Sequence, residues 1–175
     1  MEPVEKINRC ARLSRTLALA ASLVVAAPLA AEERDEAYTM TVIVDAAYGS
    51  KIAAGKYERA IESITTAKRS RDAYSKQTNL CVAYTKTGAL DKATAACEAA
   101  LAEMLDGRKS RRNYFAPALA SRQDRVYLAV ALSNLGVLQA AKGKTDQARD
   151  KFLEAAELDT DLAAPKINLA RLAKG

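Results

Sequence analysis

Apolar residues along most of the chain recur at the spacing of a helix, and glycines interrupt the pattern at intervals. The clearest stretch covers residues 129–161, "AVALSNLGVLQAAKGKTDQARDKFLEAAELDTD", where one apolar stripe ends near Gly143 and a second follows it. A stripe with a period near 3.6 residues predicts an amphipathic helix, and a glycine after it favours a turn. The pattern therefore predicts a helix, a tight turn and a second, antiparallel helix.

The same arrangement recurs around Gly55 and Gly88. Relative to each of the three glycines, alanines stand five and twelve residues later, and a residue able to pack stands nine residues later. These positions hold Ala60, Ala93 and Ala148, then Ala67, Ala100 and Ala155, and finally Ile64, Cys97 and Phe152. Gly55 and Gly88 are 33 residues apart, which is a typical period for stacked repeats. Small alanines let paired helices approach closely, so we expect stacked hairpins in an all-α protein.

These features resemble the tetratricopeptide repeat (TPR) family. The resemblance rests on the two alanines after each glycine, on the packing residue between them, and on small or apolar residues seven and eight positions before the glycine. Those preceding residues are Leu80 and Cys81 in one unit, and Leu135 and Gly136 in the next. The resemblance implies a TPR-like α-solenoid of about three helix-turn-helix units and a C-terminal capping helix.

The expected domain covers residues 41–175. Its units fall at about 41–73, 74–107 and 129–161, with the capping helix at 163–173. A basic insertion at 106–125 separates the second unit from the third, and its glycine, asparagine and proline predict that part of it is a loop.

The first unit fits the pattern less well than the others. It begins with "TVIV" from Thr41 to Val44, and such β-branched residues favour a strand. Ala46, Ala47 and Ala53 support a helix, and a stacked fold requires one at this place. We therefore expect a helix here.

The N-terminal region has the features of a secretory signal peptide. The basic residues Lys6, Arg9, Arg12 and Arg15 precede an uncharged apolar stretch at residues 16–31. This stretch is shorter than the roughly 20 residues that a membrane-spanning helix needs. We expect residues 1–31 to be removed on export across the inner membrane, which leaves an acidic arm at 32–40 and places the protein in the periplasm. The alternative is an uncleaved N-terminal membrane anchor.

Composition argues against several classes of function. Removing residues 1–31 takes away four basic and two acidic residues, which lowers the formal net charge from +6 to about +4 and leaves no dense positive field for nucleic acid. The chain has no histidine, the commonest general base and metal ligand. It also has no glycine-rich phosphate loop, no metal-ligand cluster and no nucleophile beside a base. We expect a protein that is not an enzyme, holds no cofactor or metal and binds no nucleic acid.

Two cysteines lie in one predicted hairpin. Cys81 is seven residues before Gly88 and Cys97 is nine after it, so both lie at a similar height on opposite helices. In an oxidising compartment this placement favours a disulfide. The alternative is a pair of buried cysteines that act as small apolar side chains.

The resemblance places a peptide-binding groove along the first helices of the units. Residues expected to face it are Asp45, Thr78, Val82, Lys86, Ser133 and Val137. Asn79 and Asn134 both stand nine residues before their glycines, and Asn168 matches them in the last helix. A column of amides offers donors and acceptors that hold a peptide backbone. Alternatively, these asparagines are ordinary family residues that form hydrogen bonds within the fold.

The sequence leaves three functions open. The first is a non-enzymatic scaffold of the bacterial envelope that holds a protein or peptide partner in its groove. The second is peripheral binding to an anionic envelope surface, lipid or wall polymer, through the basic patch of Arg108, Lys109, Arg111 and Arg112. The third is self-assembly into a homo-oligomer through the exposed ends of the stack.

Overall fold

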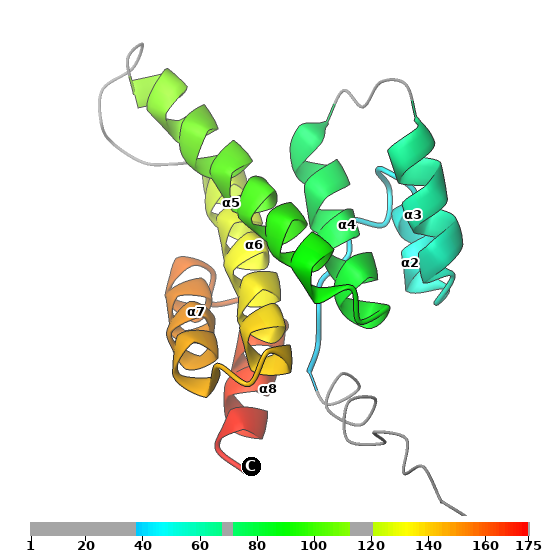
Figure 1. Ribbon diagram of the computed structural model, residues 1–175. Coiled ribbons are helices and arrows are strands. Elements are labelled where there is room, and N and C mark those ends of the chain that lie inside the picture. Colours follow the sequence, from blue (N-terminus) through cyan, green and yellow to red (C-terminus); the bar gives the residue numbers. More distant parts are fainter. Residues whose placement is uncertain (1–37, 68–71, 113–120, 175) are drawn as a thin grey trace, which may run out of the picture.

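A computed structural model of the chain describes residues 38–67, 72–112 and 121–174 (Figure 1). All regular secondary structure within these ranges is helical, which confirms the all-α class. The helices are α2 (Gly49–Ala53), α3 (Tyr57–Thr66), α4 (Ala73–Lys86), α5 (Leu90–Arg112), α6 (Arg122–Ala141), α7 (Thr145–Leu158) and α8 (Ala163–Leu172). The predicted signal peptide at 1–31, and residues 32–37 of the predicted acidic arm, lie outside the described residues.

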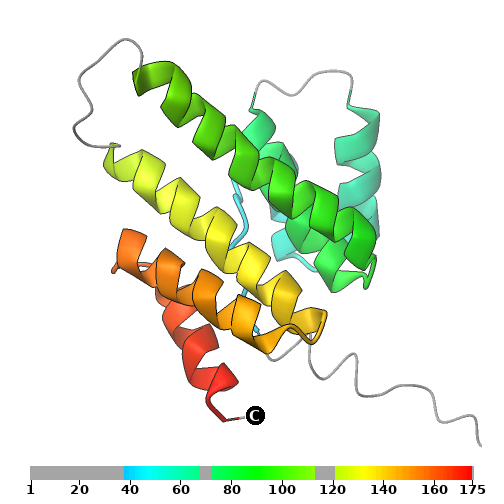
Figure 2. The same ribbon diagram turned by 60° about the vertical axis from the view of Figure 1, so that its left-hand side comes forward.

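The helices form hairpins that lie side by side, as Figures 1 and 2 show. The hairpins are α2–α3, α4–α5 and α6–α7. Their first helices contact one another in order, α2 with α4 and α4 with α6, and α6 also contacts α8. Each second helix packs against its own partner and against the first helix that follows: α3 touches α4, α5 touches α6, and α7 touches α8.

A glycine ends the first helix of each hairpin. Gly55, Gly88 and Gly143 have φ angles of 71°, 72° and 75°, the left-handed conformation that side chains with a Cβ disfavour. A Cβ at any of the three would meet no atom within 4 Å. The backbone conformation of the turn, rather than a lack of space, therefore accounts for glycine at these positions.

Small residues stand where the paired helices cross. Ala60, Ala93 and Ala148 are fully buried. At Gly136 in α6, a Cβ would lie 2.5 Å from Cε1 of Phe152 in α7. Because Phe152 is itself fully buried, its ring has little room to move aside. The α6–α7 crossing thus depends on the absence of a side chain at Gly136.

The insertion lengthens two helices. α5 continues through Arg112 and α6 begins at Arg122, so the first helix of the third hairpin starts well before the expected Ala129. Its start is set by a capping box in which the hydroxyl of Ser121 accepts from the backbone N–H of Asp124, and the carboxylate of Asp124 accepts from the N–H of Ser121. The residues "SRQD" carry this signal in the sequence.

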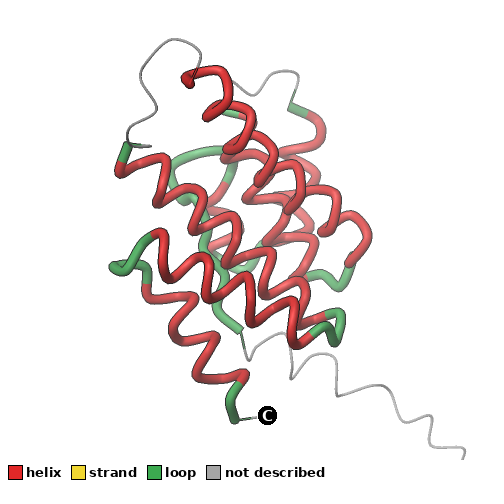
Figure 3. Tube along the Cα trace, turned by 90° about the vertical axis from the view of Figure 1, so that its left-hand side faces the viewer, coloured by secondary structure: helices red, strands yellow, loops and turns green. Residues whose placement is uncertain are grey.

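The helix expected from Thr41 does not form, and this part of the prediction was wrong. Regular helix begins only at Gly49, and residues 38–43 have no regular secondary structure (Figure 3). Thr41, Val42 and Ile43 are β-branched, and such side chains lose rotamer freedom in a helix. Backbone groups of this segment, called the strap (residues 38–43) below, find their partners on the other helices instead.

Candidate polypeptide-binding site

Three asparagine side chains hold the strap by its backbone. The amide oxygen of each accepts from one N–H: Asn168 from Thr39 at 2.8 Å, Asn134 from Thr41 at 2.8 Å and Asn79 from Ile43 at 2.9 Å. The Nδ2 of each donates to the carbonyl of that same strap residue, at 2.8, 2.8 and 3.0 Å respectively. These asparagines, one each on α8, α6 and α4, are called the asparagine ladder below.

The ladder pairs with the strap much as a neighbouring β-strand would. A carboxamide carries one acceptor and one donor group side by side, which matches the N–H and C=O of a single residue. The bonded residues are Thr39, Thr41 and Ile43, and this spacing of two is the period of an extended chain. The ladder therefore holds an extended backbone and leaves its side chains free to point elsewhere.

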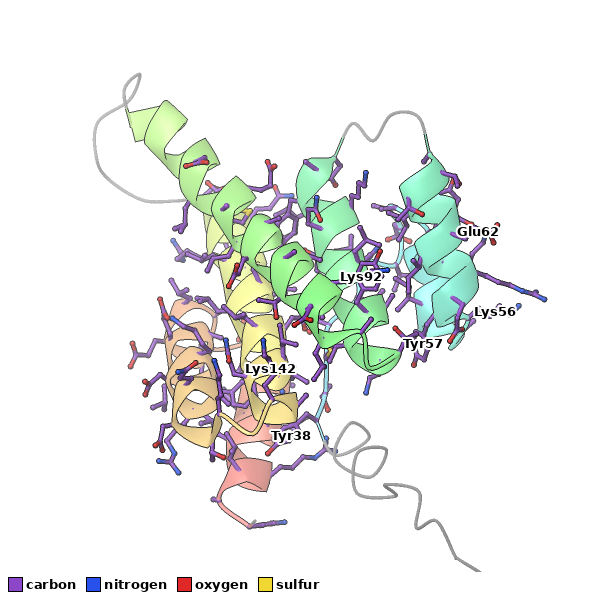
Figure 4. The ribbon with its side chains drawn as sticks, viewed as in Figure 1. Tyr38, Lys56, Tyr57, Glu62, Lys92 and Lys142 are labelled. Atoms are coloured by element: carbon purple, nitrogen blue, oxygen red, sulfur yellow. A yellow bond between two sulfur atoms is a disulfide. The ribbon has the colours of Figure 1, made fainter. Side chains whose placement is uncertain are left out.

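The alternate side chains of the strap pack onto the helices. Tyr38 and Met40 lie against the cluster that contains Val137 and Phe152, and the ring centroids of Tyr38 and Phe152 are 6.2 Å apart. Met40 and Val42 also pack against the cluster around Cys81 and Leu138. Figure 4 places Tyr38 beside the ends of α6 and α8. Apolar contacts at every second residue, from Tyr38 to Val42, thus accompany the backbone hydrogen bonds, and Ile43 at the end of the strap packs against the cluster around Tyr74 and Leu128.

The strap makes the ladder a buried structure. Asn79, Asn134 and Asn168 are 0%, 1% and 0% exposed. Asn79 also donates to the carbonyls of Ala46 at 2.9 Å and Ala47 at 3.4 Å, in the turn that leads to α2. Burying an amide without partners costs about 1–3 kcal/mol, so the six ladder bonds are needed for the ladder to be buried at all.

The other residues predicted to line a groove fall into two groups. Thr78, Val82, Ser133 and Val137 are buried beside the ladder, on α4 and α6. Lys86 lies in the last turn of α4 and is half-buried. Asp45 does not join them, because it lies exposed in the turn between the strap and α2. The strap itself, which supplies the polypeptide for this site, was not predicted.

The two cysteines of the α4–α5 hairpin lie at disulfide distance. Their Sγ atoms are 2.01 Å apart and their Cα atoms 4.8 Å apart. Both residues are buried, next to the alanines of the crossing. The pair links the ladder-bearing α4 to the helix that packs behind it.

The other features at issue in the sequence are the basic patch, metal-ligand clusters and membrane-spanning helices. Residues 108–112 of the basic patch form the C-terminal end of α5, while their side chains lie outside the described part of the chain. In residues 38–106 and 121–174 with their gap at 68–71, His, Cys, Asp and Glu side chains form no group of three that could hold a metal ion. None of the described helices is both long and apolar enough to cross a membrane.

The burial of Tyr74 in α4 affects its titration. Its ring stacks on Tyr127 of α6 with centroids 4.9 Å apart, and its hydroxyl donates to the carbonyl of Tyr127 at 2.7 Å. Burial raises the pKa of Tyr74 far above its usual value. This contact joins the same two helices that carry Asn79 and Asn134.

We compared the chain with protein-family models, with curated proteins and with solved structures, and none of them matches it.

Proposed function

We propose that this chain is an exported, non-enzymatic binding module of TPR-like architecture that holds an extended polypeptide segment on its asparagine ladder. The order of the hairpins and the repeated alanine and glycine positions support the architecture. The observation that carries the proposed function is the strap, a polypeptide already seated on the ladder by six backbone hydrogen bonds. The features of a signal peptide in residues 1–31 support a periplasmic location.

The mode of recognition follows from these contacts. The six hydrogen bonds of the ladder to the strap all involve backbone atoms of the strap, so they suit many sequences. Selectivity comes from the apolar surface that receives Tyr38, Met40 and Val42. A segment that fits is extended and carries apolar side chains at every second residue, as in other complexes where main-chain bonds give affinity and alternate side chains give specificity.

A partner segment has to displace the strap before it binds. The strap is covalently attached, and a short linker gives it an effective concentration of the order of millimolar. A free peptide with equal intrinsic affinity therefore binds the intact chain weakly. A partner segment therefore binds when its concentration is high or when it makes additional contacts with the helices.

The test uses the full chain with a weakened strap, Met40→Asp/Val42→Asp. The probe is a fluorescent peptide with the sequence of residues 37–44, and its anisotropy is followed on titration with protein. We expect binding to the weakened variant at least about tenfold tighter than to the unaltered chain, because two apolar contacts of the competing strap are lost.

Two controls make this result specific. A probe N-methylated at the residue equivalent to Thr41 lacks the donor for Asn134 and should lose most of its affinity. A probe with aspartate at the positions of Met40 and Val42 should also bind poorly. Circular dichroism establishes that the variant keeps its helices. No binding to a helical variant would refute the proposed function.

A further inference from the structure

We infer that the strap exchanges between two copies of this chain, so that the strap of each copy seats on the asparagine ladder of the other and a closed dimer forms. This inference rests on the proposed function, because it names the polypeptide that the ladder takes in trans. Residues 38–43 fit the ladder through six hydrogen bonds, and a second copy of the chain carries the same segment.

The connection between the strap and α2 is strained. Ala47 and Tyr48 have φ angles of 45° and 60°, and neither is a glycine. Left-handed conformations at such residues are unfavourable and persist only where the surroundings impose them. In this connection Val44 and Tyr48 are 49% and 45% exposed, so only about half of each residue is packed against the rest of the protein. An extended connection would release the backbone strain at Ala47 and Tyr48. Exchange allows the connection to extend while the strap keeps its contacts with a ladder, which then belongs to the other copy.

Other contacts favour the closed monomer. Asn79 donates to the carbonyls of Ala46 and Ala47, and Gly49 packs so tightly on Ile43 that a Cβ would lie 1.9 Å from the carbonyl oxygen. These contacts bend the chain back towards α2, and they have to break before the strap leaves the ladder of its own copy. The closed form therefore dominates in dilute solution, and the exchanged form increases with protein concentration.

Exchange produces a closed pair rather than a chain of copies. Each copy donates one strap and offers one ladder, so reciprocal exchange satisfies both copies with two-fold symmetry. All six ladder bonds and the contact between Tyr38 and Phe152 are preserved, since only their covalent connection to α2 changes. The partner is thus a second copy, seated by the contacts already described.

The test uses variants of the full chain that each carry one additional cysteine, in a Cys10→Ser background that keeps the Cys81–Cys97 pair. One carries Thr39→Cys in the strap and the other Arg171→Cys in α8. In the unaltered chain Nη1 of Arg171 donates to Oγ1 of Thr39 at 3.3 Å, so the two positions are close. The variants are mixed at equal, increasing concentrations and treated with a short bismaleimide. We expect a covalent heterodimer, together with a concentration-dependent dimer mass by light scattering. A mixture with Glu62→Cys, which lies on α3 away from the strap (Figure 4), gives the level of random collision.

A second variant tests the role of the turn. Ala47→Gly adopts the left-handed conformation without strain, so it should reduce the heterodimer yield at least about fivefold while the helices remain intact. A heterodimer yield no higher than the Glu62→Cys control overturns the exchange. If the labelled peptide still binds the weakened strap variant in that case, the proposed function stands and the partner is a foreign segment. If the peptide also fails, both proposals fall.

Discussion

The side chain of Asn168, in the last helix, holds the backbone of Thr39, 129 residues earlier, by two hydrogen bonds of 2.8 Å. This contact ties the strap to α8, which also packs on α6 and α7. Asn168→Ala removes both bonds and leaves the half-buried backbone N–H and C=O of Thr39 without these partners. We expect the free energy of unfolding to fall by about 2–3 kcal/mol, measured by urea denaturation. Hydrogen exchange in α8 should accelerate more than in α4.

A matched control for this prediction lies beside the ladder. Ser133 is fully buried, and its hydroxyl has no hydrogen-bond partner in the described part of the chain. Ser133→Ala removes a polar atom that makes no bond, so it should change the free energy of unfolding by less than about 1 kcal/mol. If Ser133→Ala costs as much as Asn168→Ala, the ladder bonds are not the cause of the loss.

The approach of α6 to α7 gives a second prediction. Gly136→Ala places a Cβ 2.5 Å from the ring of Phe152, and the resulting overpacking should lower the free energy of unfolding by about 1–3 kcal/mol. Phe152→Leu in the same background frees space and should recover part of this loss, which a double-mutant cycle measures. Gly143→Ala has no such neighbour and should show no coupling to Phe152→Leu. Additive effects of Gly136→Ala and Phe152→Leu would contradict the close contact.

Local regularities in the sequence were enough to predict the helical hairpins. The turn glycines have positive φ, and the alanines at 60, 93 and 148 are buried, because a helix period and a tight turn are set by residues close together in the chain. The β-branched run at Thr41 was also visible, but the expectation of a regular repeat outweighed it. The extended strap shows that the local preference was the better guide there.

The candidate site was predictable in part. The placement of Asn79, Asn134 and Asn168 predicts a column of amides, which binds either the backbone of a partner peptide or groups within the fold. The hydrogen bonds in the structure are of the second kind, because the backbone that these residues hold belongs to the same chain. No local pattern indicates which polypeptide fills the column, because Thr41 and Asn134 are 93 residues apart. Only the assembled helices bring these residues together.

The cysteine pair gives a third prediction. Cys81 and Cys97 are 16 residues apart in the sequence, and closing a loop of that size contributes about 3 kcal/mol by restricting the unfolded chain. Cys81→Ala/Cys97→Ala should lower the free energy of unfolding by that amount. Reduction of the unaltered protein with dithiothreitol should give a similar loss, and it should have no effect on the double variant. Free thiols at both positions in protein purified without reducing agent would contradict a disulfide.

The buried tyrosine gives a prediction in alkaline solution. Burial, with smaller contributions from Tyr127 and Asp72, raises the pKa of Tyr74 above its ordinary value of 10.0. Above pH 10 the unfolded chain releases this proton while the folded protein keeps it, so the folded state binds more protons and stability falls as pH rises.

The variant Tyr74→Phe lacks this titrating hydroxyl. At pH 8 it should be less stable by about 1 kcal/mol, because the hydrogen bond to the carbonyl of Tyr127 is lost. Between pH 10 and pH 11.5 the difference from the unaltered protein should shrink in urea titrations. Parallel curves for the unaltered protein and Tyr74→Phe would show that Tyr74 titrates alike in the folded and unfolded chain.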